Sequence, residues 1–409
     1  MLQNRIAVIG GGPAGMIAAA TAGSLGKDVV LFEKNNKLGK KLFLTGKGRC
    51  NITNAGEVED LIENIVANKS FLYSAFYSFT NTDIIELLKS YGVDTKIERG
   101  NRIFPVSDKS SDVIKALERY LSHEKVKIVL NKEVKYIEKL DDDKFKIVFT
   151  NSEEQYFNKV IVATGGKSYQ QTGSTGDGYL FAKSFGHSIT NLRPALIPCE
   201  IKEEWVKELQ GLALKNVKVS AYVENSKIFE DFGELLFTHY GISGPIVLTM
   251  SSYINKYYGN KIKIVIDLKP ALSDEKLEVR ILRDFEKYSK KQFKNSLEDL
   301  LPRKLIPIII KLSNINEDKF VNQITREERK NIVHLLKNLE MSFSDFRPIN
   351  EAIVTSGGVA TLEIDSSTMG SKIVEGLFFA GEVIDVHALT GGYNLQIAYS
   401  TGYLAGLNC

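Results

Sequence analysis

The hydrophobic pattern at the start of the chain predicts a strand, a helix and a second strand. Residues 6–9 form a short apolar run, an alanine-rich segment continues to residue 25, and residues 28–34 (DVVLFEK) are apolar again. A glycine-rich turn at residues 10–15 separates the first run from the helix. This order predicts a βαβ unit.

Farther along, the spacing of apolar residues is helical at residues 71–88 and again at residues 111–121. From residue 126 to residue 163 the period changes to two, beginning with an apolar run at residues 127–130. This change predicts a small antiparallel meander that feeds back into a buried parallel strand. A helix is expected near residues 179–185.

A different domain is predicted to begin near residue 191. The pattern is rich in strands at residues 217–223, 235–238 and 262–268, and then becomes charged and helical. Glycine density and buried-strand composition return near the C-terminus. We predict a nucleotide-binding domain at residues 1–190 and 350–409, an inserted β-rich substrate domain at residues 191–273 and 340–349, and a helical subdomain at residues 274–339.

Composition narrows the class of protein without giving its activity. The 409 residues, 43% hydrophobic and 25% charged, are those of a globular protein with more than one core. A net charge of +3 neither supports nor excludes a nucleic-acid partner. Three scattered cysteines predict no disulfide framework and no zinc site. With no signal peptide or transmembrane segment visible, we expect a cytoplasmic protein without a membrane partner.

The glycine turn carries the first chemical signal. Gly10, Gly12 and Gly15 form G-x-G-x-x-G between a predicted strand and a predicted helix, and Pro13 and Ala14 complete the turn. Gly10 permits a tight turn, Gly12 lets the backbone approach a pyrophosphate, and Gly15 allows the helix to pack closely. Amides at the start of the helix then face the phosphates. The pattern predicts a dinucleotide site.

An acidic residue ends the second predicted strand. The carboxylate of Glu33 can accept hydrogen bonds from ribose hydroxyls, and its charge disfavours a 2′-phosphate at that position. Lys34 follows it directly and is included in the predicted site.

A basic, glycine-rich segment, residues 39–54 (GKKLFLTGKGRCNITN), follows the βαβ unit. Its cationic side chains and bare backbone can both approach a flat, anionic ligand, although a basic surface loop is the alternative interpretation. The predicted contacts here are Lys41, Gly48, Arg49, Cys50 and Asn51.

Two later segments resemble the first glycine turn, because each has a predicted buried strand, then a glycine-rich loop and then a helix. They are residues 160–179 and residues 376–406. Glu382 lies where a carboxylate can bind ribitol hydroxyls, and the helix after Gly392 is expected to face the flat ring or a phosphate. The further predicted contacts are Val134, Ala163, Thr164, Gly165, Gly381, Glu382, Gly391, Gly392, Tyr393 and Asn394.

Four side chains are candidates for moving a proton. Cys50 lies beside Arg49, where the cation can lower the pKa of the thiol or the thiol can donate a proton; core packing is the alternative. His239 and Tyr240 fall in a glycine-flanked turn of the inserted domain and serve either catalysis or the turn itself. His387 is expected in an exposed loop.

The motifs occur in the order GGGPAG, Glu33, GKGRCNITN, RGNRIFPVSD, ATGG, LFTHYGISGP, TSGGV and FAGEVIDVHALTGGYNLQIAYSTGYLAG. Over nearly the whole chain this order resembles the bacterial flavoproteins known as aminoacetone-oxidase-like or BaiN-like FAD-binding enzymes. The resemblance implies an α/β protein: a glutathione-reductase-like, Rossmann-type FAD-binding domain, an inserted β-barrel-like domain and a small helical subdomain. A weaker resemblance links the ATGG and glycine-pair motifs to fumarate reductase and succinate dehydrogenase flavoproteins.

Members of this family have been associated with reduction of a bile-acid intermediate, and one branch with making dihydrouridine in ribosomal RNA. We therefore expect an FAD-dependent oxidoreductase that reduces an activated C=C bond. Because only one dinucleotide turn is convincing, NAD(P)H would visit the flavin transiently.

Uridine in 23S ribosomal RNA is the preferred substrate by resemblance, with the basic runs at residues 288–294 and 326–330 as its electrostatic contact. A flavoenzyme acting on a small unsaturated steroid or bile acid, an amine or a dicarboxylate is one alternative. A non-catalytic, FAD-containing module that binds RNA or protein is another.

Overall fold

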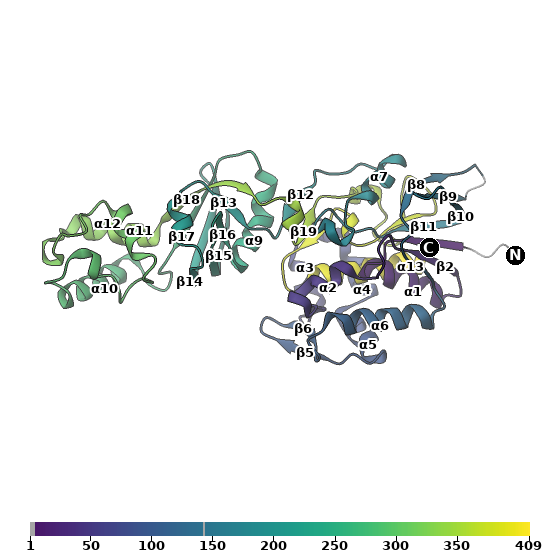
Figure 1. Ribbon diagram of the computed structural model, residues 1–409, viewed down its shortest axis with the longest axis horizontal. Coiled ribbons are helices and arrows are strands. Elements are labelled where there is room, and N and C mark those ends of the chain that lie inside the picture. Colours follow the sequence, from purple (N-terminus) through teal and green to yellow (C-terminus); the bar gives the residue numbers. More distant parts are fainter. Residues whose placement is uncertain (1–4, 142–143) are drawn as a thin grey trace. The chain divides into compact units, whose positions relative to one another are not determined.

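The computed structural model describes residues 5–141 and 144–409 (Figure 1). The chain divides into two compact units. The first combines the chain up to Ala195 with Pro348–Cys409, and the second is Leu196–Arg347. The predicted division into three parts stays a prediction.

A five-stranded parallel sheet forms the centre of the first unit. Four of its strands are largely buried, as expected for a parallel sheet covered on both faces, and the edge strand β7 is only partly buried. The strand order is β20 (Leu377–Phe379), β11 (Lys159–Val162), β1 (Arg5–Ile9), β2 (Asp28–Phe32) and β7 (Lys127–Val129). The predicted βαβ unit is therefore β1, α1 (Pro13–Ser24) and β2.

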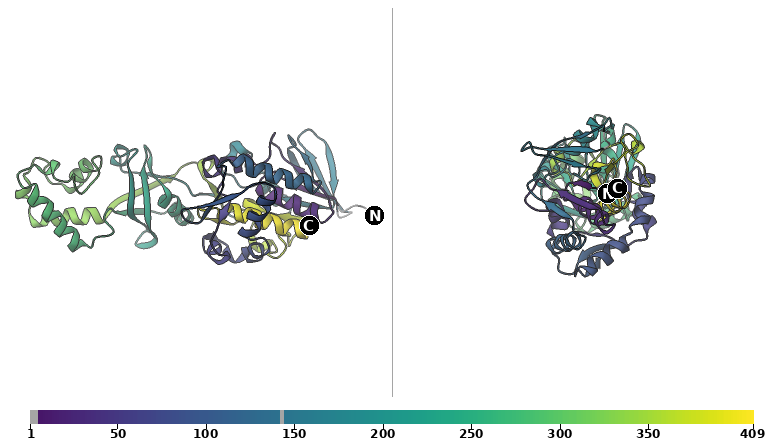
Figure 2. Two further views of the ribbon diagram at one scale, coloured as in Figure 1. Left: turned by 90° about the horizontal axis from the view of Figure 1, so that it is seen from below. Right: turned by 90° about the vertical axis from the view of Figure 1, so that its right-hand side faces the viewer.

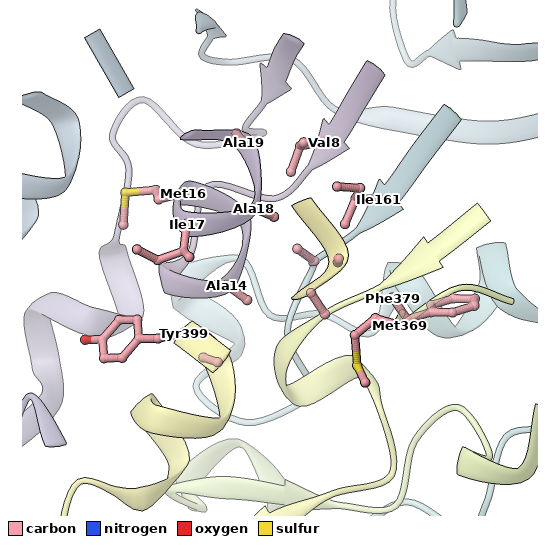
Figure 3. Packing of buried hydrophobic residues seen from close by; sticks show 14 of the residues in the cluster. Val8, Ala14, Met16, Ile17, Ala18, Ala19, Ile161, Met369, Phe379 and Tyr399 are labelled. Carbon is pink, nitrogen blue, oxygen red and sulfur yellow. The ribbon is translucent and has the colours of Figure 1, made fainter. Parts of the chain in front are cut away.

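Two helices from opposite ends of the chain lie side by side, α1 and α13 (Tyr393–Asn408) (Figures 1 and 2). Small residues allow this close approach, because a Cβ on Gly402 would lie 2.4 Å from the carbonyl oxygen of Ala14. Figure 3 shows Ala14, Ile17 and Tyr399 in the buried core around these helices. The N- and C-terminal segments thus share one core.

The helical pattern at residues 71–88 belongs to two helices rather than one, α4 (Tyr73–Ser78) and α5 (Asn81–Ser90). Thr80 separates them because it caps α5: its hydroxyl accepts the Asp83 N–H, and its own N–H donates to the Asp83 carboxylate. The remaining α-helices of this unit are α2 (Lys40–Leu44), α3 (Val58–Glu63), α6 (Ser110–His123) and α7 (Asp177–Ser184).

The predicted meander begins one strand later than expected. Residues 127–130 do not begin it, because Lys127–Val129 pairs in parallel with β2 at the edge of the main sheet. The antiparallel meander is β8 (Val134–Lys139), β9 (Phe145–Phe149) and β10 (Glu154–Phe157). Short strands complete the unit: β3 (Thr53–Asn54) with β6 (Arg102–Pro105) and β5 (Thr95–Glu98), β4 (Ile65–Ala67) with β21 (His387–Ala388), and β12 (Arg193–Ala195) with β19 (Val354–Ser356).

The second unit is built around a closed antiparallel barrel, which confirms the expected β-barrel-like insertion. Its strand order is β13 (Cys199–Ile201), β16 (Gly241–Ser243), β15 (Ser226–Phe237), β14 (Ala213–Val223), β17 (Ile262–Asp267) and β18 (Leu339–Phe346). Alternate residues such as Val219, Ala221 and Ile264 fill its interior. The helices are α8 (Trp205–Glu208), α9 (Pro245–Ile254), α10 (Asp274–Lys287), α11 (Ile306–Ser313) and α12 (Arg326–Lys337).

No helix in the described part of the chain is both long and apolar enough to pass through a bilayer. Over the same residues, no group of three His, Cys, Asp or Glu side chains is arranged to hold a metal ion.

Candidate cofactor and active site

A cavity in the first unit lies at the carboxyl ends of the parallel strands, the edge where open α/β sheets bind ligands. Gly10, Glu33, Lys132, Ala163 and Ala380 line it, each close after the end of one of the five strands. The predicted site residues in its wall are Gly10, Gly12, Pro13, Ala14, Glu33, Lys34, Lys41, Val134, Ala163, Thr164, Gly165, Gly381, Glu382 and Asn394.

The glycine turn leaves bare backbone facing this cavity. Gly10 has φ +107, and a Cβ there would lie 2.4 Å from the Ala163 carbonyl oxygen. At Gly15 a Cβ would lie 1.9 Å from the Gly10 carbonyl oxygen, so Gly15 packs inside the turn and not at the cavity. Around Gly12 a Cβ would meet nothing within 4 Å. The open space beside Gly12 is therefore available to a ligand.

Glu33 is buried in the cavity wall and held by neutral donors. Its Oε2 accepts the Gly11 N–H at 2.7 Å, and its Oε1 accepts the backbone and side-chain N–H groups of Asn35 at 2.8 and 2.7 Å. Within residues 5–141 and 144–409, no lysine or arginine forms an ion pair with Glu33. The carboxylate is therefore oriented beside the cavity by neutral donors. Lys34 instead pairs with Asp177 at 2.6 Å.

Glu382 is held differently, by an internal network. Its Oε2 lies 2.6 Å from Lys41 Nζ, and its Oε1 accepts the Thr355 N–H at 2.8 Å and the Ser168 hydroxyl at 3.0 Å. Burial pushes the Glu382 pKa upward, but Lys41 and these hydrogen bonds outweigh it and hold the pKa below its usual value. Glu382 was expected to bind ribitol hydroxyls. Groups of the protein compete with such hydroxyls, because they already bond to both carboxylate oxygens.

The start of α13 lines the cavity only from Asn394 onward. The side-chain amide of Asn51 is oriented so that its oxygen accepts the Gly392 N–H at 3.0 Å and its nitrogen donates to the Ile103 and Thr53 carbonyls. Gly391, Gly392 and Tyr393 lie outside the cavity wall, whereas Asn394 lies in it.

The basic segment is also arranged differently from its prediction. Lys41 lines the cavity, but Gly48, Arg49, Cys50 and Asn51 do not. Arg49 instead forms ion pairs with Glu98 at 2.8 Å and Asp108 at 3.2 Å. Cys50 is fully buried, and burial raises its pKa to about 12. The expected lowering of the Cys50 pKa by Arg49 is therefore wrong.

His387 is not in an exposed loop. It lies in the short strand β21 and is 2% exposed, and neither ring nitrogen has a hydrogen-bond partner within the described residues. Burial lowers its pKa to about 4, so the ring is neutral at pH 7.

His239 and Tyr240 occupy the tight turn between β15 and β16 in the second unit, closed by a hydrogen bond from the Thr238 N–H to the Gly241 carbonyl at 2.8 Å. His239 is exposed, and its ring packs edge to face on Tyr240. The guanidinium of Arg347 lies 4.7 Å from the Tyr240 ring centre. Both side chains are thus presented by a fixed turn.

Several cavity residues were not predicted from the sequence. Lys132 and Glu133 follow β7, and residues 172–174 belong to the loop after β11. All of them follow a strand of the parallel sheet, and that position could have identified them. For Lys132 and Glu133, this requires recognising β7 as part of the main sheet. The other unpredicted residues include Gly11, Asn35, Leu42, Thr45, Ile353, Val386 and Ala398.

The cavity fits the adenine dinucleotide part of FAD. Bare backbone at Gly12, the first turn of α1 and the uncompensated carboxylate of Glu33 offer what a pyrophosphate and a ribose require. Apolar residues such as Val134, Phe181 and Ile353 supply apolar contact area in the same wall.

Comparison with known proteins places the chain among flavoproteins of this fold. The family described as "HI0933-like protein Rossmann domain" matches residues 4–408. The 3-dehydro-bile acid delta(4,6)-reductase of Clostridium scindens is 33% identical over 99% of this chain and 98% of its own length. The ribosomal RNA dihydrouridine synthases of Haemophilus influenzae and Escherichia coli are 34% and 32% identical, over 98% and 97% of this chain and 97% and 95% of their own lengths.

Among solved structures, the fold is similar to that of 3-ketosteroid delta1-dehydrogenase from Sterolibacterium denitrificans. The TM-score is 0.52 at 12% identity, covering 98% of this chain and 99% of the other. A 3-ketosteroid-delta4-(5alpha)-dehydrogenase from Rhodococcus jostii gives 0.51 at 14% identity, over 98% and 96%. These similarities support the predicted α/β class and the Rossmann-type domain.

Proposed function

This chain belongs to the HI0933-like Rossmann-domain family and is an FAD-dependent oxidoreductase, and we propose that it uses NAD(P)H to reduce an activated C=C bond. The preferred substrate is uridine in 23S ribosomal RNA. We further propose that FAD occupies the cavity of the first unit, with its pyrophosphate at Gly12 and its ribose at Glu33.

The observation that carries this proposal is the full-length similarity to relatives whose names describe one kind of chemistry. A delta(4,6)-reductase and a dihydrouridine synthase both add hydrogen across a C=C bond, and in uracil that bond is conjugated with a carbonyl group. Conjugation makes the bond electrophilic, which is what a hydride donor requires.

Bound FAD, once reduced, supplies a hydride to one carbon of the double bond. The other carbon needs a proton, which a positioned side chain must deliver. We propose His239 and Tyr240 as the candidates, because a closed turn presents both and His239 is exposed. Cys50 is a weaker candidate, since its thiol is buried away from the cavity wall.

Exposed basic side chains in residues 274–339, here called the helical segment, favour ribosomal RNA over a small substrate. They include Lys290, Lys291 and Lys330. Other cations of the segment are already paired, such as Lys287 with Asp299 at 2.6 Å. If RNA is the substrate, its retention by the protein should fall steeply with salt. Binding that is unchanged between low and high salt would favour the small-molecule alternative.

The electron donor is tested by anaerobic spectroscopy. We expect NADH or NADPH to bleach the flavin absorbance of the purified protein, and an acceptor to restore it. A flavin that neither donor bleaches rejects the NAD(P)H assignment, and together with RNA binding it would favour the non-catalytic module.

The substrate is tested in cells. Mass analysis of ribosomal RNA nucleosides should show loss of dihydrouridine when the gene is deleted, and its return with the wild-type chain. His239→Ala and Tyr240→Phe should fail to restore it while keeping bound FAD. Unchanged dihydrouridine in the deletion strain rejects RNA and leaves an unsaturated steroid acid, an amine or a dicarboxylate to be assayed.

A further inference from the structure

The chain reverses direction at residues 45–50, here called the 45–50 turn, with an unusual backbone. Gly46, Lys47, Gly48 and Cys50 have φ values of 57, 58, 85 and 63, all in the left-handed region. This conformation suits glycine but costs about 1 kcal/mol or more for other residues. Lys47 and Cys50 therefore need support from the surrounding structure.

Arg49 supplies that support by joining the turn to the β5–β6 hairpin. Its Nη1 and Nη2 lie 2.8 and 3.2 Å from the two carboxylate oxygens of Glu98, and Nη1 lies 3.2 Å from Asp108. The guanidinium also lies 4.1 Å from the ring centre of Phe104. Lys96 adds a second cation, 2.6 Å from Asp108. A forked, stacked arginine in a charge network fixes geometry far better than a single surface ion pair.

The turn that Arg49 holds begins in the cavity wall. Thr45 lines the cavity, and its carbonyl accepts the Cys50 N–H at 3.0 Å, which closes the turn. The Thr45 hydroxyl donates to the Leu42 carbonyl at 2.7 Å, and Leu42 and Lys41 line the cavity as well. A displacement of Arg49 would therefore shift these wall residues, because the backbone of the turn connects them to Arg49.

We infer that Arg49 is a positioning residue: anchored to Glu98 and Asp108, it keeps the 45–50 turn closed and so holds Thr45, Leu42 and Lys41 in the cavity wall. Arg49 acts through the turn and touches no ligand. Only the FAD-binding readout described below rests on the proposed function.

The first test is limited trypsin digestion of the full-length protein, with and without added FAD, reading cleavage after the exposed Lys47 by mass spectrometry. Arg49→Gln should speed this cleavage about tenfold, because an unanchored turn opens more often. Glu98→Gln should do the same, and the double variant should be no faster than either single variant. Arg102→Gln is the matched control, since Arg102 lies near Phe104 but donates to the Arg99 carbonyl outside the network.

The second test is titration with FAD, followed by its fluorescence. Arg49→Gln and Glu98→Gln should raise the FAD Kd by a similar factor, about three- to tenfold. Arg49→Lys should fall between these variants and the wild type, because lysine keeps the charge but cannot form the fork.

Either of two results overturns the inference. If Glu98→Gln leaves the Kd unchanged while Arg49→Gln raises it, Arg49 contacts the ligand directly. If cleavage after Lys47 is unchanged in both variants, Arg49 does not hold the turn. Should Arg49→Gln fail to fold, Glu98→Gln and Asp108→Asn carry both tests. Because digestion without FAD needs no activity, its outcome is independent of the reaction proposed above.

Discussion

The two ends of the chain form parts of one cavity wall with the same order of strand, glycine turn and helix, yet their carboxylates are held in different ways. From the described residues, Glu33 accepts hydrogen bonds only from neutral N–H donors. Glu382 lies 2.6 Å from Lys41, which compensates its charge. The start of α1 leaves open space beside Gly12, whereas the Gly392 N–H is taken up by Asn51. An acidic residue after a parallel strand is therefore suited to a ligand only where the protein does not provide its counter-charge.

The largest effect should come from Gly15→Ala, in the N-terminal region. The new Cβ would lie 1.9 Å from the Gly10 carbonyl oxygen, and backbone on both sides would have to move. We expect the free energy of unfolding of the FAD-free protein to fall by about 3 kcal/mol or more. Urea unfolding measures it, and a loss below about 0.5 kcal/mol would contradict the packing described for Gly15.

Gly12→Ala should separate ligand binding from stability. A Cβ there meets no atom of the described residues within 4 Å, so urea unfolding of the FAD-free protein should be unchanged. The same methyl group would occupy the space for a pyrophosphate, and we expect the FAD Kd to rise about tenfold or more. Wild-type affinity would place the dinucleotide elsewhere.

Lys41→Met tests the C-terminal region. It leaves Glu382 without its cation, and we expect a loss of about 2 kcal/mol at pH 7, less than for a fully buried pair. Because the folded-state pKa of Glu382 is lowered, this stabilisation is present above the unfolded pKa of about 4.3 and is lost as pH falls below it.

The difference between wild type and Lys41→Met should therefore shrink on acidification. Urea unfolding at pH 7 and pH 4 measures this change. Lys41→Met combined with Glu382→Gln should recover part of the loss, because no uncompensated charge remains. A difference that is the same at both pH values would remove Glu382 from the explanation.

Glu33→Gln should give the smallest change. The amide oxygen of glutamine can still accept the Gly11 N–H, but its NH2 group would face the two Asn35 donors, so we expect a loss of about 1 kcal/mol in the free energy of unfolding. The loss of charge should weaken hydrogen bonds from ribose hydroxyls and raise the FAD Kd about fivefold, measured by calorimetry. Glu382→Gln is the matched substitution, and its FAD Kd should change by less than about twofold if Glu382 is an internal brace.

The parts of the fold that the sequence predicts are those with local signals. The βαβ unit follows from one contiguous stretch, in which an apolar strand, a glycine turn and an alanine-rich helix succeed one another. Parts of three barrel strands, β14, β15 and β17, follow from their sequence pattern, whereas β13 and β18, whose pairing joins residues far apart in the chain, were not predicted.

The site was less predictable because its partners are distant in the sequence. Lys41 and Glu382 are 341 residues apart, and no local pattern indicates that one neutralises the other. The sequence predicts Arg49 as a ligand contact, because nothing local indicates its partners Glu98, at the end of β5, and Asp108, in the loop after β6. His387 was expected to be exposed, and its burial depends on pairing between β21 and β4, which are both very short.

The strands at which the barrel unit leaves and re-enters the first unit are neighbours. Arg193–Ala195 pairs with Val354–Ser356, with Ala195 opposite Val354. The barrel unit is therefore an insertion whose two ends are held together by paired strands, and lengthening an insertion of this kind adds little to the entropic cost of closing it. The second unit can therefore be exchanged or reshaped in evolution to suit a new substrate, while the cofactor-binding unit stays unchanged.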